Sequence, residues 1–275
     1  MRRLEGKVAF VTGAGRGQGR SHAVRLAREG AAVIAVDICA PVESVTYPMA
    51  DEADLAETGR LVEEHDVRAF TQTADVRDRE GLRAALEAGL GELGRLDIVV
   101  ANAGIASYAA FHEISEDAWQ EMLDINLTGV WNTCVVARPA LVESKGGSII
   151  ITSSAAVLKP PANLTHYAAA KHGTVGVMRS LAKELAPEMI RVNTIHPTQV
   201  DTPMVMNQEV FEMFRPELDS PDREDIVAPS TEMNLMPIPW VSSDDVSDTV
   251  VFLASDESKY ITGVMIPIDA GYHLK

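Results

Sequence analysis

Short apolar runs rich in β-branched residues alternate along the chain with longer amphipathic stretches. Most of the short runs lack the in/out alternation of a half-exposed strand, and this pattern indicates strands buried on both faces of a parallel sheet. We predict strands at residues 8–12, 32–37, 70–74, 96–101, 148–152, 191–195 and 264–268. Between them, apolar residues recur at helical spacing in the stretches 21–29, 80–90, 119–137 and 167–185.

The repeated strand–helix alternation predicts an α/β fold: a doubly wound, Rossmann-type parallel sheet of about seven strands flanked by helices. No linker rich in Pro, Gly or Ser and no internal repeat divides the chain, so we expect a single domain over residues 1–275. Two segments do not fit the alternation, the loop 39–54 and the stretch 202–239 with its scattered Pro, Met and Phe. Because loops of this length in compact domains are usually functional, we interpret 39–54 as an insert and 202–239 as a candidate lid.

The formal charge of −16 at pH 7 argues against nucleic acid and anionic membrane surfaces as partners, because both would repel the chain. The N-terminal arginines precede no apolar signal region, and no run of about 18 apolar residues occurs, so we expect a cytoplasmic protein. Cys39 and Cys134 lie far apart in the sequence, which favours two reduced thiols. His166 and His172 have no Cys, Asp or Glu at metal-binding spacing, and we expect them on a helix surface with no metal.

A glycine-rich turn, TGAGRGQG at residues 12–19, follows the first predicted strand and leads into a helical pattern. Glycine permits the tight turn and the close approach of the backbone to a pyrophosphate, which the helix N-terminus attracts. Many strand–helix turns are rich in glycine for other reasons, so the residues elsewhere in the chain must show whether this turn binds a nucleotide. The candidate nucleotide contacts in this turn are Gly13, Arg16, Gly17, Gln18 and Gly19.

Asp37, which ends the next predicted strand and is followed by Ile38, provides that context. A carboxylate at this position accepts hydrogen bonds from the adenosine ribose and repels a 2′-phosphate, which favours NAD. Arg16 instead favours NADP, because a guanidinium can bind the 2′-phosphate of that cofactor. We give more weight to Asp37, since like charges at hydrogen-bond distance repel strongly. Further candidates at predicted strand ends are Asp75, Val76, Asn102, Ala103 and Gly104.

Tyr167 and Lys171, in the run YAAAK, are four residues apart and therefore lie on one helix face. A phenol with an ordinary pKa of about 10 becomes a base near neutral pH only if a nearby cation lowers that pKa. Ser154 ends the fifth predicted strand, where its hydroxyl can hold a substrate oxygen. Asn126 falls inside a predicted helix, where Asn is disfavoured, so it has either a functional role or a place in a water-satisfied kink. For each feature alone, a structural explanation remains open.

Together, these motifs resemble the short-chain dehydrogenase/reductase family in order and spacing, from residue 7 to residue 271. The resemblance implies that Tyr167 is the general acid/base and that Lys171 lowers its pKa and binds the nicotinamide ribose. It also implies that Ser154 polarises the substrate oxygen and that Asn126 anchors a water molecule that relays protons to Lys171. The segment 196–202 aligns with the Pro-Gly motif beside the nicotinamide, although Thr198 replaces the usual glycine. By this alignment Pro197, Val200 and Thr202 are cofactor contacts.

The insert, the run Pro239-Trp240-Val241 and residues 260–263 resemble the carveol-dehydrogenase-like subfamily that is linked to the redox carrier mycofactocin. This resemblance implies that NAD stays bound and that a mycofactocin-type electron carrier reoxidises it. The family resemblance also implies a homotetramer. Methionines and phenylalanines in 202–239 suggest an apolar pocket for a terpenoid- or steroid-like alcohol or ketone.

We therefore predict an NAD-dependent oxidoreductase that acts on a hydrophobic secondary alcohol or ketone. The alternatives are an NADP-dependent carbonyl reductase and a non-catalytic NAD-binding regulator. A regulator has no reason to combine Ser154, Tyr167 and Lys171. A sugar-nucleotide epimerase, which shares the YxxxK run, would need a larger substrate domain after the sixth strand.

Overall fold

The computed structural model describes residues 2–275 and contains one seven-stranded parallel sheet in the order β3-β2-β1-β4-β5-β6-β7. The doubly wound fold is therefore confirmed. The strands are β1 (Val8–Thr12), β2 (Ala32–Asp37), β3 (Ala69–Thr73), β4 (Ile98–Ala101), β5 (Gly147–Thr152), β6 (Ile190–Pro197) and β7 (Met265–Ile268). Strands β1 and β2 have the predicted bounds and are buried apart from the partly buried Ala32. The other strands differ from prediction by one or two residues at one or both ends.

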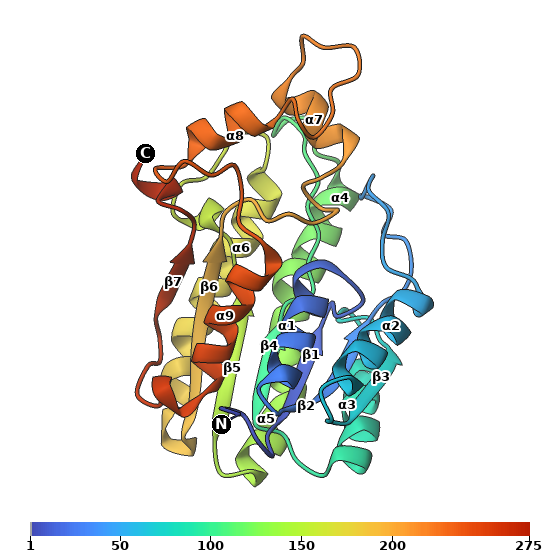
Figure 1. Cartoon of the computed structure of the whole chain (residues 1–275), viewed down its shortest axis with the longest axis vertical. Helices are drawn as coiled ribbons and strands as arrows, with labels where there is room; N and C mark the ends of the chain where they lie inside the picture. Colours follow the sequence, from blue (N-terminus) through green and yellow to red (C-terminus); the bar gives the residue numbers. More distant parts are fainter. Residues whose placement is uncertain (1) are drawn as a thin grey trace.

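Helices cover both faces of the sheet (Figure 1). One face carries α1 (Gly17–Arg28), α2 (Glu52–Glu63) and α9 (Ser243–Ala254); the other carries α3 (Arg79–Leu93), α4 (Glu116–Leu123), α5 (Gly129–Glu143) and α6 (Thr165–Glu184). Two clusters of buried apolar side chains form the core, one between the sheet and each helix layer. None of the helices in residues 2–275 has the length and apolar character that a membrane crossing needs.

The predicted helical stretch at 119–137 is helical throughout. It is not a uniform α-helix, because a π-helical turn, Asp124–Thr128, which contains Asn126, lies between α4 and α5. Such turns insert a residue into the helical ladder and are frequent at functional sites. The loop that we predicted at 39–54 ends earlier, because Asp51 and Asp54 form a capping box and α2 begins at Glu52.

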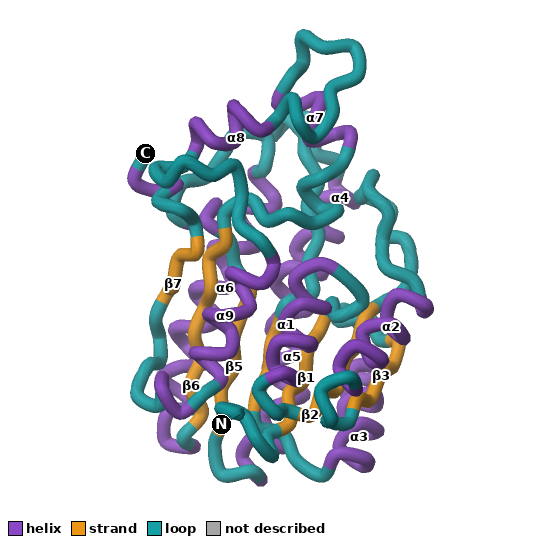
Figure 2. Tube along the Cα trace, in the orientation of Figure 1, coloured by secondary structure: helices purple, strands orange, loops and turns teal. Residues whose placement is uncertain are grey.

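The carboxyl ends of the strands and most long loops gather at one edge of the sheet (Figure 2). The segment 202–239 lies above this edge and contains two short helices, α7 (Gln208–Phe214) and α8 (Val227–Met233), that the sequence did not predict. Each has only two turns, too short for helical periodicity to emerge from its surroundings. The insert lies beside α2 and α4 at the same edge (Figure 1). The structure thus brings both irregular segments to the place where open α/β sheets bind their ligands.

Candidate active site

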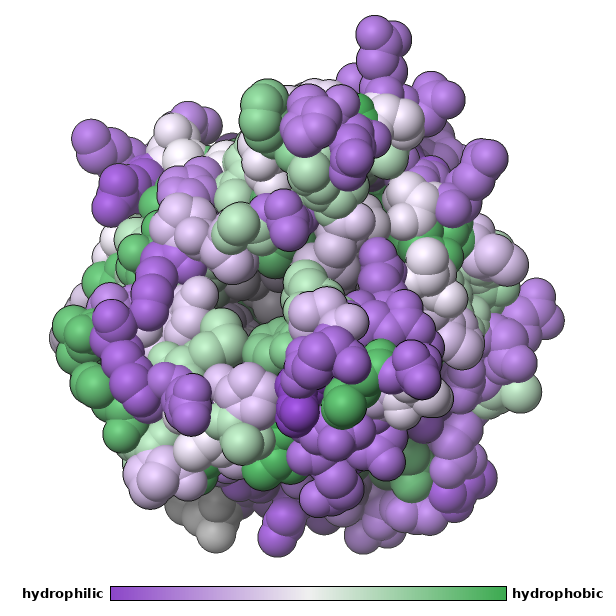
Figure 3. All heavy atoms as spheres, turned by 90° about the horizontal axis from the view of Figure 1, so that it is seen from above, coloured by the Kyte–Doolittle hydropathy of each residue, from purple (hydrophilic) through white to green (hydrophobic). Residues whose placement is uncertain are grey.

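A cavity of about 560 Å³ opens at the carboxyl edge of the sheet. Figure 3 views the molecule onto this edge and shows a hollow near its centre, bordered by hydrophilic and hydrophobic residues. Apart from Asn126, every predicted site residue lines the cavity. These residues are Gly13, Arg16, Gly17, Gln18, Gly19, Asp37, Ile38, Asp75, Val76, Asn102, Ala103, Gly104, Ser154, Tyr167, Lys171, Pro197, Val200 and Thr202.

The turn after β1 has no room for side chains at two of its glycines. A Cβ at Gly13, where φ is +66°, would lie 2.7 Å from Ala103 Cα, and a Cβ at Gly19 would lie 1.9 Å from the Gly13 carbonyl oxygen. The helix that follows begins with no side-chain cap from Arg16. Because the first amides of a helix lack intrahelical acceptors, this end of α1 offers free N–H groups to an anion in the cavity.

Asp37 is held in place at the end of β2 by main-chain donors. Its Oδ2 accepts a hydrogen bond from Gly15 N at 2.8 Å, and its Oδ1 accepts one from Cys39 N at 3.2 Å. A carboxylate has about four acceptor sites, so capacity remains for ribose hydroxyls. The Arg16 guanidinium is directed at the insert, with its carbon 5.7 Å from the centre of the Tyr47 ring and a nitrogen 3.7 Å from Met49 Sδ. The cation that would favour NADP therefore already has partners on the insert.

Asn102 ties three strand ends together beneath the cavity. Its Nδ2 donates to the Thr12 carbonyl at 3.1 Å, and its Oδ1 accepts from Thr152 Oγ1 at 3.2 Å. Asp75 lies at the β3 end of the cavity, where Arg77 pairs with its carboxylate at 2.8 Å. The hydrogen bonds of Asn102 thus join the ends of β1, β4 and β5 at the floor of the cavity.

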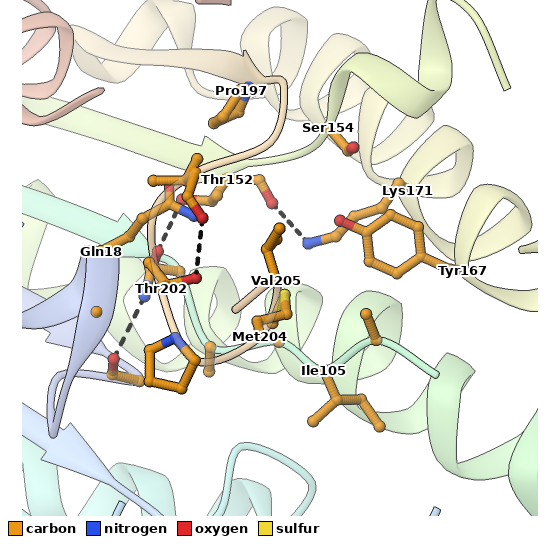
Figure 4. Close-up of a pocket in the computed structure, with 18 of the residues that line it drawn as sticks. Gln18, Ile105, Thr152, Ser154, Tyr167, Lys171, Pro197, Thr202, Met204 and Val205 are labelled. Atoms are coloured by element: carbon orange, nitrogen blue, oxygen red, sulfur yellow. Dashed lines mark hydrogen bonds between the residues drawn. The ribbon is translucent and has the colours of Figure 1, made fainter. Parts of the chain in front are cut away.

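Ser154, Tyr167 and Lys171 converge on one side of the cavity (Figure 4). Lys171 Nζ is buried, donates to the Thr152 carbonyl at 2.8 Å and lies 5.7 Å from the centre of the Tyr167 ring. Burial lowers the pKa of Lys171 to about 8. Burial also raises the pKa of Tyr167, and a hydrogen bond with Ser154 opposes that rise in part. The pKa of Tyr167 rises because desolvation outweighs the hydrogen bond with Ser154.

The hydroxyl of Ser154 is oriented by its own turn. Its Oγ accepts a hydrogen bond from Ala156 N at 3.1 Å, which leaves the hydroxyl proton free to be donated. Ser154 lowers the pKa of Tyr167, which places the serine hydroxyl near the phenol. An oxygen atom placed between the serine and the tyrosine would thus meet a donor from each side chain.

Asn126 does not line the cavity, and its burial has a specific cause. Its Oδ1 accepts from Ile105 N, and its Nδ2 donates to the Ile105 carbonyl, both at 2.8 Å. This reciprocal pair satisfies the amide that a helix interior would otherwise disfavour. A Cβ at Gly104 would lie 2.9 Å from Asn126 Oδ1 and 3.4 Å from Lys171 Nζ, so both groups border the same small space. The predicted relay through a water molecule stays a prediction.

The segment after β6 closes the cavity opposite Tyr167 (Figure 4). Val200 pairs with Val241 in an isolated parallel bridge, and Thr202 Oγ1 donates to the Val200 carbonyl at 3.4 Å. Met204 and Val205 follow directly and line the cavity between this loop and the side chains of Tyr167 and Lys171. Thr198, which replaces the usual glycine of the family motif, also lines the cavity. The segment 196–202 therefore borders the cavity despite this replacement.

Sequence reasoning missed several residues of the site. Tyr47 and Tyr108 line the cavity, and Tyr47 Oη accepts a hydrogen bond from Ala106 N at 3.1 Å. The loop 105–108 directly follows the fourth predicted strand, and this position could have identified it as part of the site. The prediction of a surface His166 is wrong: the ring is buried, and its Nε2 lies 3.0 Å from Ser107 Oγ, because this loop covers the start of α6. His172 is exposed, as predicted.

The fold, the nucleotide-type turn after β1 and the serine–tyrosine–lysine group at the strand ends define an oxidoreductase of the Rossmann type. The family model described as short chain dehydrogenase matches residues 7–212, and the chain belongs to this family. Among its relatives, the (-)-trans-carveol dehydrogenase of Rhodococcus erythropolis is 53% identical over 277 residues, and the match covers 100% of both chains. The predicted resemblance to this family and to carveol dehydrogenases within it is therefore confirmed.

Two solved structures show the same architecture. The carveol dehydrogenase of Mycobacterium avium, in complex with NAD, has a TM-score of 0.99 and 53% identity, with 100% of each chain covered. A short chain dehydrogenase of Mycobacterium paratuberculosis bound to NAD has a TM-score of 0.90 and 42% identity, covering 99% of this chain and 100% of the other. The agreement extends over the insert and the segment 202–239, since nearly the whole chain is aligned.

Proposed function

We propose that this protein is an NAD-dependent dehydrogenase that interconverts a hydrophobic secondary alcohol and its ketone. The observation that carries the proposal is the single cavity that joins Asp37 at one end to Ser154, Tyr167 and Lys171 at the other. The predicted NAD cofactor is confirmed by the relatives, of which two are NAD complexes and another is named an NAD-dependent oxidoreductase. The direct test is oxidation of cyclic secondary alcohols by the purified protein, with both NAD and an artificial electron acceptor supplied.

The residues of the cavity fit NAD. The carboxylate of Asp37 suits free ribose hydroxyls, and the glycines leave space where a pyrophosphate would meet the N-terminus of α1. Gln18 Oε1 is buried in the cavity wall without a hydrogen-bond partner among residues 2–275, so a donor from a bound molecule would satisfy it. A 2′-phosphate would place two like charges together at Asp37, which supports NAD over NADP.

The side chains divide the proton chemistry among themselves. When bound, NAD would take the hydride from the carbinol carbon or, once reduced, return it to the ketone. Ser154 donates its hydroxyl proton in a hydrogen bond to the substrate oxygen and fixes that oxygen beside the phenol. Tyr167 removes the alcohol proton during oxidation and returns it during reduction, and Lys171 favours the phenolate by its charge. We further propose that Asn126 supports proton exchange with Lys171 through a water molecule beside Gly104.

The segment 202–239 acts in this proposal as a lid over an apolar substrate. Its side chains in the cavity wall are Thr202, Pro203, Met204, Val205, Met213, Phe214 and Met233. Flexible methionine and aromatic side chains suit a bulky, weakly polar molecule. The name of the Rhodococcus relative supports a terpenoid-like alcohol as substrate here too.

Replacing Phe214 with alanine is expected to raise the KM for a cyclic terpenoid alcohol by roughly tenfold or more, because apolar contact with the ring is lost. The KM for a small alcohol such as 2-propanol should change little, since it does not reach the lid. Phe111→Ala, at a side chain that is 75% exposed and outside the cavity, is the matched control. A strict preference of the wild type for small charged hydroxy acids would contradict the proposal that 202–239 is a lid over an apolar substrate.

We also propose a homotetramer. Apolar side chains exposed on the protomer support it, among them Trp131 on α5 and Met189 before β6. Sedimentation is expected to give a particle of four times the chain mass of 29.7 kDa. A stable monomer at micromolar concentration would rule the tetramer out.

A further inference from the structure

We propose that His196 is a positioning residue for the reaction proposed above: a neutral imidazole with its proton on Nδ1 that fastens the turn of Ser154 to the sheet. His196 lies next to the end of β6 and is completely buried. Its side chain does not touch the reacting atoms, and it acts through the main chain of Ser154. The inference rests on the proposed function only in giving Ser154 its role.

The hydrogen bonds of the ring decide where its proton lies. Nδ1 is 2.9 Å from the Ser154 carbonyl oxygen, and a carbonyl can only accept, so Nδ1 must carry the proton. Nε2 is 2.8 Å from Thr194 Oγ1. In the neutral ring this nitrogen is an acceptor, so the Thr194 hydroxyl donates to it. Both nitrogens are thereby satisfied by one tautomer.

Ser154 needs such an attachment because it lies beyond the sheet. The pairing of β5 with β6 ends at Thr152, and the hydrogen bond from Ser153 N to the Ile195 carbonyl at 2.9 Å is the next contact. Inside its own turn, the Ser154 carbonyl oxygen accepts a hydrogen bond from Val157 N and its Oγ accepts one from Ala156 N, both at 3.1 Å. Among residues 2–275, the imidazole is the side chain that joins the Ser154 carbonyl to β6.

The surroundings keep the ring neutral. Burial is the main cause that lowers the pKa of His196, and the charges of Lys171 and His172 on α6 lower it further. The hydrogen bond with Ser154 and the charge of Asp269, which follows β7, raise it in part. A pKa below the ordinary value means that the neutral form persists throughout the physiological range, so the hydroxyl of Ser154 keeps its position there.

Three substitutions separate positioning from packing. In His196→Asn the side-chain amide can donate from nearly the position of Nδ1, whereas His196→Gln places its amide near Nε2 and His196→Leu keeps apolar volume without a donor. We expect kcat with a secondary alcohol to fall by roughly tenfold to a hundredfold in the Leu and Gln variants, and to stay within about threefold in the Asn variant. KM should change little in all three. Simple packing predicts the reverse order, with Leu best, and that result would overturn the proposal.

A second pair of measurements tests the tautomer of His196 and its hydrogen bond with Thr194. Neutron diffraction should find the His196 proton on Nδ1; a proton on Nε2 would overturn the assignment. Thr194→Val removes the donor to Nε2 and should lower kcat in the wild type but not in the His196→Asn background, where no Nε2 exists. Equal effects in both backgrounds would contradict the linkage. If the wild type oxidises no alcohol with NAD or an acceptor, the proposed function fails, and the proton position still decides the tautomer.

Discussion

Replacing Tyr167 with phenylalanine is expected to lower turnover by roughly a hundredfold or more, the usual effect of losing a general acid/base. The change removes one oxygen atom and leaves the ring, which packs against the core cluster on this side of the sheet. Stability and NAD binding should therefore change little. Steady-state rates with an alcohol, together with thermal melting and NAD titration, measure the three quantities.

Tyr260→Phe is the matched control, because that side chain is 84% exposed and lies outside the cavity. Its activity should equal that of the wild type. Normal turnover of Tyr167→Phe would contradict the assignment of Tyr167 as the general acid/base.

The pH dependence of the wild type should carry the same signature. Oxidation needs the phenolate, and burial raises the pKa of Tyr167, so the rate should increase with pH until the phenol has lost its proton. The positive charge of the oxidised cofactor would shift this rise to lower pH than in the protein alone. In Tyr167→Phe, the residual rate should lack that rise.

NAD is expected to stay bound to the purified protein through repeated desalting, because the insert would cover its adenosine side. The insert is tied to three separate elements. Tyr47 Oη accepts from Ala106 N, Ser44 N donates to Glu121 of α4 at 3.0 Å, and Thr46 Oγ1 donates to Glu209 of α7 in the lid. A cover that adds about 4 kcal/mol to the release barrier slows dissociation roughly a thousandfold. Turnover would then need an external acceptor, which is why we propose a mycofactocin-type electron carrier as partner.

The double variant Thr46→Ala, Tyr47→Phe removes two of these ties and should let NAD wash out, while turnover with added NAD appears. Ser180→Ala, on the exposed surface of α6, is the control and should retain NAD. The nucleotide content is measured after the protein is denatured, from the absorbance of the supernatant and the mass of the nucleotide in it. If NAD washes out of the wild type and free NAD then supports full turnover, the cover does not trap the cofactor.

The local features of this protein were determined by its sequence alone. Runs of apolar residues encode the buried strands, and Gly19 is required by a close approach to the Gly13 carbonyl oxygen within one strand–helix unit. Spacing placed Tyr167 and Lys171 on one helix face, and the parallel order of the strands brought the candidate residues to one edge. These features depend on periodicity and on short-range geometry, which a sequence displays directly.

Only the tertiary structure decided the contacts between distant segments. The π-helical turn at Asn126 depends on the main chain of Ile105, the burial of His166 depends on the loop that carries Ser107, and the insert is held by α4 and α7. In the same way, the His196 ring forms a hydrogen bond with the carbonyl of Ser154, 42 residues earlier in the chain. Such hydrogen bonds leave no periodic trace, because each joins residues whose separation in sequence is set by the fold and not by a local repeat.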